Sequence, residues 1–181
     1  ADTDGDGVVD GVEYAVGFDP TVPNSYALLC GFELMDGLSV GLLNTKQGWD
    51  ASPQEGALIV SDLARRGSQS ARLSGLDETA SHSVTSSQAK CRVRSFIYLD
   101  SQHEPPTNLP DKASCVVSYS SSNGIVAWDG THSAWMLASN TLLQNQWMCL
   151  DVQVDFSNRT WALAVNDISH LSGLGFASSE A

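Results

Sequence analysis

The N-terminal segment carries the densest group of metal-ligating side chains in the chain. Residues 2–13 read DTDGDGVVDGVE, with five carboxylates, three glycines and no lysine or arginine. Carboxylates this close together repel one another unless a cation lies among them. They fall at positions one, three, five, nine and twelve of a twelve-residue loop, with glycine at position six, which is the spacing of a calcium-binding loop. The segment therefore predicts one Ca²⁺ site.

This spacing is the register of an EF-hand loop, in which every position has its own role. The first three acids each offer one carboxylate oxygen, and the residue at position seven offers its backbone carbonyl. The acid at position nine binds directly or through water, the glutamate at position twelve gives both oxygens, and Gly7 makes the turn. The alternative is an acidic, solvated tail. The predicted ligands are Asp2, Asp4, Asp6, Val8, Asp10 and Glu13.

The stretch DTDGDGVVDGVEYAVGFDP resembles the thrombospondin type 3-like calcium repeats of bacterial extracellular proteins. It is also similar to half of a dockerin. A short helix is expected after the loop, ended by Gly17 before Pro20. In this family, tandem repeats form stiff spacers between larger modules. Since one copy is present and the chain begins at its first ligand, we expect a piece of a longer protein with neighbouring repeats upstream. Cohesin docking, which needs a second copy, is not expected.

Charge and hydropathy narrow the classes of partner. The net charge is −12, and six of the 21 acids lie in the first twenty residues, where there is no base. The rest of the chain is only mildly acidic and has no basic stripe, so nucleic acid is not an expected partner. No apolar run approaches the roughly 18 residues that a membrane-spanning helix requires, so membrane insertion is not expected.

The four cysteines lie far apart in the sequence, at Cys30, Cys91, Cys115 and Cys149. No C-x-x-C pair occurs, so a zinc site is not expected. The calcium repeat implies an extracellular, oxidising location, in which four cysteines allow three disulfide pairings. Disulfides and buried free thiols both remain open, and a pair among the last three cysteines is our first expectation.

From residue 25 onward the chain is typical of short antiparallel strands. Apolar and polar residues alternate over ten positions in AKCRVRSFIYLD, and Asn123-Gly124 and Asp129-Gly130 are strong hairpin signals. The proline-rich segment 101–112 predicts an irregular loop, and no long helical period is present. The pattern predicts an all-β sandwich. The expected strands lie in 25–34, 56–62, 68–76, 89–100, 113–120, 123–137, 146–156 and 159–167.

The hairpin QWMCLDVQVDFSNRTWALAVND carries a second resemblance, to the concanavalin A-like or laminin-G-like jelly roll. The segments GFE at 31–33 and GWDAS at 48–52 are similar to bacterial surface members of that superfamily. The resemblance implies two parts, a calcium segment at 1–24 and a β-sandwich at 25–181, whose last strand is either very short or missing. In the hairpin, Ser157-Asn158 form the turn. One face is expected to be buried by Met148, Leu150, Val152, Val154 and Phe156, and the chain is expected to return along the partner strand through Trp161, Leu163 and Val165.

A catalytic site is not expected. Glycosidases of this fold carry clustered carboxylates on one strand face, whereas here only Asp151 and Asp155 share a face and the glutamates are scattered. The four histidines are isolated from known nucleophile or metal motifs. A polysaccharide hydrolase or lyase on the same fold remains the alternative.

Binding of carbohydrate is the preferred interpretation, because sugar rings stack on aromatic side chains and their hydroxyls take hydrogen bonds from a few polar groups. Trp147 and Trp161 are expected in or near the core, and any of the other tryptophans has packing as its alternative role. The expected function is a non-catalytic, extracellular, carbohydrate-binding or adhesive module, with a structural spacer as the alternative. The candidate ligand-binding residues are Trp49, Arg92, Arg94, Tyr98, Trp128, Asp129, His132 and Trp135.

Overall fold

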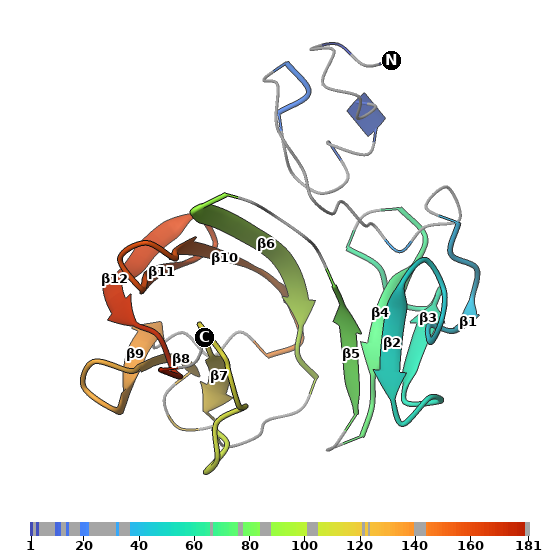
Figure 1. Cartoon of the computed structure of the whole chain (residues 1–181). Coiled ribbons are helices and arrows are strands. Elements are labelled where there is room, and N and C mark those ends of the chain that lie inside the picture. Colours follow the sequence, from blue (N-terminus) through green and yellow to red (C-terminus); the bar gives the residue numbers. More distant parts are fainter. Residues whose placement is uncertain are drawn as a thin grey trace. The chain divides into compact units, whose positions relative to one another are not determined.

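In the part of the chain that the computed structural model describes, the regular secondary structure is almost entirely β-strand (Figure 1). All pairings between its strands are antiparallel, which confirms the prediction of an all-β chain. The chain divides into two compact units, Ala1–Ser86 and Ser87–Ala181, called unit 1 and unit 2 below. The described residues are 1, 3, 10, 11, 14, 19–21, 32, 37–65, 67–75, 78–83, 88–100, 105–120, 122, 124–139 and 144–179.

The strands of unit 1 form two small antiparallel sheets. One has the order β1-β3-β4, and the other pairs β2 with β5. Every second residue of β3 is fully buried, so that Ala57 and Ile59 pack with Leu38 and Leu43 in the core of this unit. The expected strand at 25–34 lies outside the described residues, apart from Phe32. The strands are β1 Gly41–Leu42, β2 Trp49–Ser52, β3 Ala57–Val60, β4 Ser70–Leu73 and β5 Thr79–His82.

Unit 2 contains a four-stranded sheet of order β12-β11-β10-β6 and a three-stranded sheet of order β7-β8-β9. Each expected strand from residue 89 onward has a counterpart, and the predicted hairpins at Gly124 and Gly130 join β7 to β8 and β8 to β9. The strands are β6 Lys90–Tyr98, β7 Val117–Ser120, β8 Gly124–Asp129, β9 Ala134–Ser139, β10 Trp147–Asp155, β11 Thr160–Val165 and β12 Ile168–Gly175.

The core of unit 2 lies between these two sheets. Ile125 and Ala127 from the three-stranded sheet pack in one cluster with Met148 and Leu163 from the four-stranded sheet. Trp161, at the centre of the cluster, is 2% exposed and donates its indole N–H to the Gly175 carbonyl at 3.0 Å. Since residues alternate between the two faces of a strand, the neighbours of these core residues point away from the core, onto the outer face of each sheet.

Two positions of the β10–β11 hairpin differ from expectation. Strand β10 ends at Asp155, so Phe156 begins the turn instead of burying the strand face, and it is 45% exposed. Trp147 precedes the core residue Met148 and therefore lies on the outer face, where its ring packs against Tyr98 at 5.5 Å between centroids. The structure therefore places Trp147, expected in or near the core, half-buried outside the core cluster, whereas Trp161 belongs to that cluster.

The described cysteines are free thiols. Cys91 and Cys115 pack against the core, and burial raises the pKa of Cys115 to about 11, with a contribution from the nearby charge of Cys91. Cys149 lies opposite Phe96 on the outer face, so it is on the other side of the sheet from Cys91. At these three positions the structure has free thiols, of which Cys149 is buried and the other two are half-buried, in place of the expected disulfide, and Cys30 lies outside the described residues.

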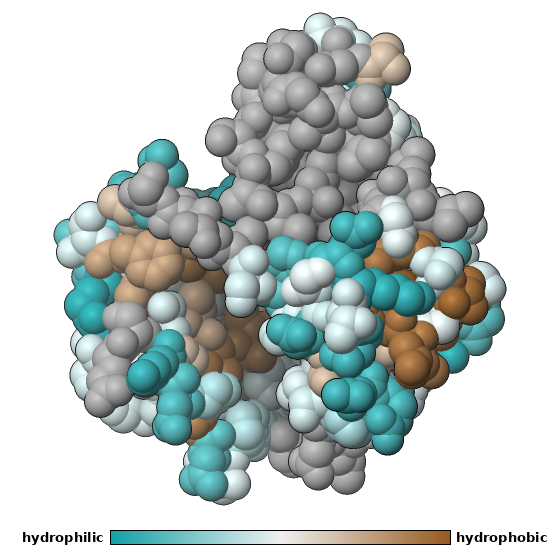
Figure 2. Space-filling view, turned by 45° about the vertical axis from the view of Figure 1, so that its right-hand side comes forward, coloured by the Kyte–Doolittle hydropathy of each residue, from teal (hydrophilic) through white to brown (hydrophobic). Residues whose placement is uncertain are grey.

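On the face that Figure 2 shows, hydrophilic and apolar patches of the described residues lie side by side. Val40, Leu42 and Leu73 are about half exposed in unit 1, and Leu137 and Ile168 are exposed in unit 2. Among the described residues, no helix is long and apolar enough to cross a membrane.

Candidate functional site

Of the predicted calcium ligands, only Asp10 belongs to the described residues, and Asp2, Asp4, Asp6, Val8 and Glu13 lie outside them. Asp10 and Gly11, within the predicted loop, and Tyr14, directly after it, are helical, and Tyr14 lies where the short helix is expected. The Asp10 carboxylate accepts hydrogen bonds from the backbone N–H of Thr3 at 2.7 Å and from its hydroxyl at 2.8 Å. These bonds, the hydroxyl first, lower the pKa of Asp10 and bring positions two and nine of the predicted loop together.

The residues predicted to bind carbohydrate lie in three separate places. The first is Trp49 on β2, which belongs to unit 1 and packs against the core there. Its ring lies between Phe32 and His82, 5.2 Å from each ring by centroid distance. The His82 ring nitrogen is in turn 3.1 Å from the Gln47 carbonyl oxygen. Trp49 is thus held in a packed aromatic cluster of its own unit.

The second place is the outer face of the three-stranded sheet. Trp128 and Trp135 face each other across β8 and β9, with ring centroids 5.4 Å apart in an edge-to-face arrangement. Their neighbour Ala127 points into the core, so both indoles lie on the opposite side of the sheet. Next to them lie the half-exposed Leu137 and its buried partner Val126. The surroundings of this pair are apolar.

Asp129 ends β8, and its carboxylate holds the following turn against β12. It is buried and accepts hydrogen bonds from the backbone N–H of Thr131 at 3.0 Å and of Gly175 at 2.8 Å. The exposed ring of His132 also donates to it through Nδ1. Burial alone would raise the pKa of Asp129, but the hydrogen bonds from His132, Gly175 and Thr131 together hold the pKa below its usual value. The oxygens of Asp129 are therefore already engaged within the fold.

The third place is the outer face of the four-stranded sheet, where Arg92, Arg94 and Tyr98 all lie. They alternate along β6 with Cys91 and Ile97, which pack against the core. Strand β6 is an edge strand paired in continuous register with β10 over nine positions. This register sets each outward side chain of β6 beside an outward side chain of β10, which are close enough to interact. We call this surface the binding face below.

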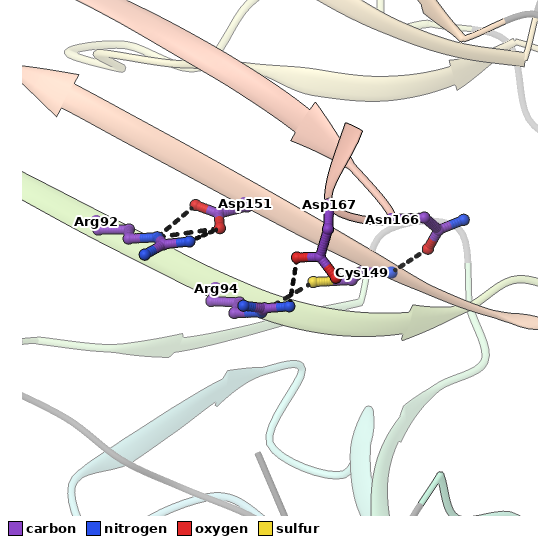
Figure 3. A network of polar contacts seen from close by, with 6 residues as sticks. All are labelled: Arg92, Arg94, Cys149, Asp151, Asn166 and Asp167. Atoms are coloured by element: carbon purple, nitrogen blue, oxygen red, sulfur yellow. Dashed lines mark hydrogen bonds and ion pairs between the residues drawn. The ribbon is translucent and has the colours of Figure 1, made fainter. Parts of the chain in front are cut away.

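The centre of the binding face is an arginine–aspartate pair (Figure 3). Arg92 Nε donates to both carboxylate oxygens of Asp151, at 2.9 and 3.0 Å, and Nη2 makes a further contact with Oδ2. The Asp151 side chain is only 4% exposed, whereas that of Arg92 is 52% exposed. The hydrogen bond to Asp151 raises the pKa of Arg92 above its ordinary, already high value. A buried carboxylate thus orients a cation whose other edge faces solvent.

Arg94, two residues further along β6, connects β10 to the β11–β12 turn. Its Nη2 donates to Asp167 at 2.5 Å and its Nε to the Cys149 sulfur at 3.2 Å (Figure 3). Asn166 and Asp167 both have positive φ, 52° and 64°, as a two-residue type I′ hairpin requires. The Asn166 side chain also accepts the Cys149 backbone N–H at 2.9 Å, so the turn is fixed against β10. Burial raises the pKa of Cys149, although Arg94 opposes this, so the thiol stays protonated at neutral pH.

One end of the binding face is aromatic. Tyr98 and Trp147 are direct cross-strand partners, and the Arg94 guanidinium lies 5.8 Å from the centroid of the Phe96 ring. All three rings are partly exposed. Because these aromatic rings are partly exposed, a ligand can stack on their flat apolar faces without disturbing the packed core.

The other end of the binding face is an open hollow of about 490 Å³. Its floor includes Ala162 and Gly173, whose small size leaves room above β11 and β12. A Cβ added at Gly173 would meet no other atom within 4 Å. The rest of the lining is mixed, with polar or charged residues at Lys90, Arg92, Gln153, Asp155 and Thr160 and with Cys91, Val154 and Trp161.

The sequence indicated Arg92, Arg94 and Tyr98 but not their partners. Strand alternation alone predicts that Trp147, Asp151 and Gln153 lie on one face of β10. The pairing of β6 with β10 does not follow from the sequence pattern, because Arg92 and Asp151 are 59 residues apart in the chain. Asp151 and Asp155, considered above as a catalytic pair, each contact a cation of β6, Arg92 and Lys90 respectively.

Comparison with known proteins gives no relative: no family model, no curated protein and no solved structure matches this chain.

Proposed function

We propose that this chain is a non-catalytic, calcium-binding extracellular module, and that unit 2 binds a glycan or cell-surface polysaccharide on its binding face. The observation that carries the proposal is the Tyr98–Trp147 pair, which shares one sheet face with an open hollow of about 490 Å³. We further propose that the fold is a concanavalin A-like jelly roll preceded by an EF-hand-like loop, on the strength of the resemblances in the sequence. Upstream repeats of a parent protein would be its neighbours.

The chemistry of the binding face suits a saccharide. Sugar rings have apolar C–H faces that stack on aromatic rings, and the Tyr98–Trp147 end supplies two of these. The hydroxyls of a bound sugar need directed donors and acceptors, which Arg92, Gln153 and Thr160 supply around the hollow. Strand β6 runs for nine residues, about 30 Å at ~3.3 Å per residue, so an extended chain of several sugar units fits along it.

The contacts of Asp151 and Asp155, the two acids of β10 on this face, support a non-catalytic role. A glycosidase needs one carboxyl group with a raised pKa to act as the general acid. Hydrogen bonds from Asn158 and the contact with Lys90 instead lower the pKa of Asp155. Asp151 is buried behind Arg92 and both of its oxygens are engaged. Neither acid is placed to protonate a leaving group.

The calcium proposal rests on the loop spacing and on Asp10, the one described ligand. Its carboxylate stays ionised, because the hydrogen bonds from Thr3 lower its pKa. Glu13 gives two oxygens in the EF-hand register, so Glu13→Gln should weaken calcium affinity more than Asp10→Asn. Isothermal titration with CaCl₂ measures both, and equal losses would contradict the assignment.

A glycan-array screen of the whole chain tests the carbohydrate proposal. The screen is run in 1 mM CaCl₂ and repeated with chelator present. We expect hits that survive chelation, because the binding face belongs to unit 2 and the calcium loop to unit 1. Hits that are lost with calcium would place an ion at the binding face. The absence of any hit in both conditions would favour a structural spacer.

A further inference from the structure

We infer that the binding face takes a neutral saccharide and not an acidic one. The inference rests on the proposed carbohydrate binding and names the class of ligand for that same face. It follows from how the cations of the face are paired: each of the three has a carboxylate of its own. The pairs are Lys90–Asp155, Arg92–Asp151 and Arg94–Asp167.

The contacts of Arg92 with Asp151 leave few N–H groups of its guanidinium for an acidic ligand. An arginine holds a carboxylate best with two parallel N–H bonds from one edge of its guanidinium. In Arg92 the edge formed by Nε and Nη2 is already bound to both oxygens of Asp151. A ligand carboxylate would have to use the remaining edge, with the negative charge of Asp151 directly behind it. The remaining N–H groups suit the neutral oxygen of a sugar hydroxyl equally well.

The other two cations are also neutralised. Arg94 is only 15% exposed, and its Nε and Nη2 are bound to Cys149 and Asp167. The Lys90 ammonium is exposed but lies 3.3 Å from Asp155, so an anion that approaches it also meets that carboxylate. Three cations and three carboxylates sum to zero, within a chain whose net charge is −12. An acidic ligand therefore gains no net Coulomb attraction at this face.

Uncharged hydrogen-bonding groups are present beside the pairs. Gln153 and Thr160 both line the hollow. Within the part of the chain that the structure describes, neither side chain makes a hydrogen bond to another residue, so both can serve a ligand. An amide and a hydroxyl each donate and accept, as a sugar hydroxyl does. The free polar groups of the hollow thus match a neutral ligand.

The test uses the whole chain on an array on which each acidic glycan is printed beside its neutral form, for example polygalacturonate beside its methyl ester and dextran sulfate beside dextran. We expect the neutral forms to bind. Affinity for the strongest hit should change less than about twofold between 50 and 500 mM NaCl, since screening weakens only charge attraction. Preferential binding of the acidic forms that is lost at high salt would overturn the inference and leave carbohydrate binding intact. Binding of no glycan would overturn the proposed function and the inference with it.

A charge variant tests the pairing directly. Asp151→Asn keeps the shape of the side chain and removes the charge behind Arg92, so we expect binding of polygalacturonate to rise about two- to fivefold at 50 mM NaCl. Asp62→Asn is the matched control, because Asp62 pairs with Arg72 at 2.8 Å in unit 1 and the net charge changes equally. Equal effects of the two variants would overturn the role of Asp151. If Asp151→Asn alters the circular dichroism spectrum, Asp155→Asn beside Lys90 replaces it.

Discussion

The two outer faces of unit 2 carry the same local feature in different surroundings. Each has a pair of aromatic rings facing each other across neighbouring strands, Tyr98–Trp147 at 5.5 Å and Trp128–Trp135 at 5.4 Å. On the four-stranded sheet the pair shares its face with ion pairs and with an open hollow at the other end of the strands. On the three-stranded sheet it adjoins the apolar Leu137 and Val126.

Under the proposed function, an aromatic pair alone does not mark a binding site. Cross-strand rings stabilise a sheet by about 0.2–1 kcal/mol whether or not a ligand is present. Recognition also needs polar groups that are positioned but not fully used inside the fold. Asp129, beside Trp128, is fully engaged in holding a turn, whereas Asp151 positions Arg92, which remains half exposed. The predictions below separate these two uses of a buried carboxylate.

The largest effect is expected at Asp129. Asp129→Ala should lower the free energy of unfolding by about 3 kcal/mol, because it leaves the N–H groups of Gly175 and Thr131 without their acceptor in a buried site. Urea denaturation at pH 7 measures the change. His132→Ala is the control, since that ring is 70% exposed, and it should cost less than 1 kcal/mol. A loss below about 0.5 kcal/mol for Asp129→Ala would show that the turn does not depend on this carboxylate.

A smaller loss is expected at Asp151. Asp151→Ala should cost about 1–2 kcal/mol, because its partner Arg92 is half exposed and can turn to water after the change. The same urea titrations compare it with Asp129→Ala. If Asp151→Ala proves the more destabilising of the two, then the arginine pair is mainly structural, and the distinction between the two faces fails.

Calcium removal should act locally. With a Kd of about 10⁻⁴ M, 1 mM calcium adds roughly 1.4 kcal/mol to the local order of the loop. We expect chelation to speed amide exchange in residues 1–20 and to leave exchange in β10 and β11 unchanged. Hydrogen exchange followed by mass spectrometry measures both. A single cooperative collapse of the whole chain under chelator would contradict the separation of the two segments.

The pH dependence of Asp129 is the finest of these tests. Its pKa in the folded state lies below its usual value, and the pKa of an unfolded aspartate is about 3.9. Its charge therefore stabilises the fold fully above about pH 5, and this contribution is lost as the pH falls through the folded-state pKa. The difference in unfolding free energy between wild type and Asp129→Asn should shrink from pH 5 to pH 3. A constant difference would mean that the ionised form is not favoured by folding.

Local pattern predicted the strands of unit 2 except β12, which runs for eight residues where the last strand was expected to be very short or missing. Alternation in AKCRVRSFIYLD and in the hairpin 146–167 corresponds to β6, β10 and β11, because the period of a strand is set by the backbone and not by its partners. Asp129-Gly130 lies at a hairpin, as predicted. Glycine is required at position 130, because the Cβ of any other residue would lie 1.8 Å from the Phe176 carbonyl oxygen. The pattern does not determine the residue at which a strand ends. The prediction that Phe156 is buried on the strand face is wrong for that reason.

Long-range pairing was not predictable from one sequence. No local signal connects β6 with β10, so the Arg92–Asp151 and Tyr98–Trp147 contacts became visible only in the fold. Likewise, the candidate ligands Trp49, Trp128 and Trp135 were grouped by residue type, although Trp49 belongs to the other unit and the other two to the opposite face. Residue type indicated the chemistry, and topology decided where it lies.

The most direct test of the account is a pair of tryptophan variants, Trp147→Ala and Trp135→Ala, each titrated calorimetrically with the strongest glycan from the array. Both remove a partly exposed indole from a cross-strand pair, so their effects on stability should be similar. We predict that Trp147→Ala weakens binding at least about tenfold, because stacked aromatic residues dominate interface energies, whereas Trp135→Ala leaves affinity within about twofold of wild type. The reverse result, or equal losses from both variants, would contradict the assignment of the ligand to the face of β6 and β10.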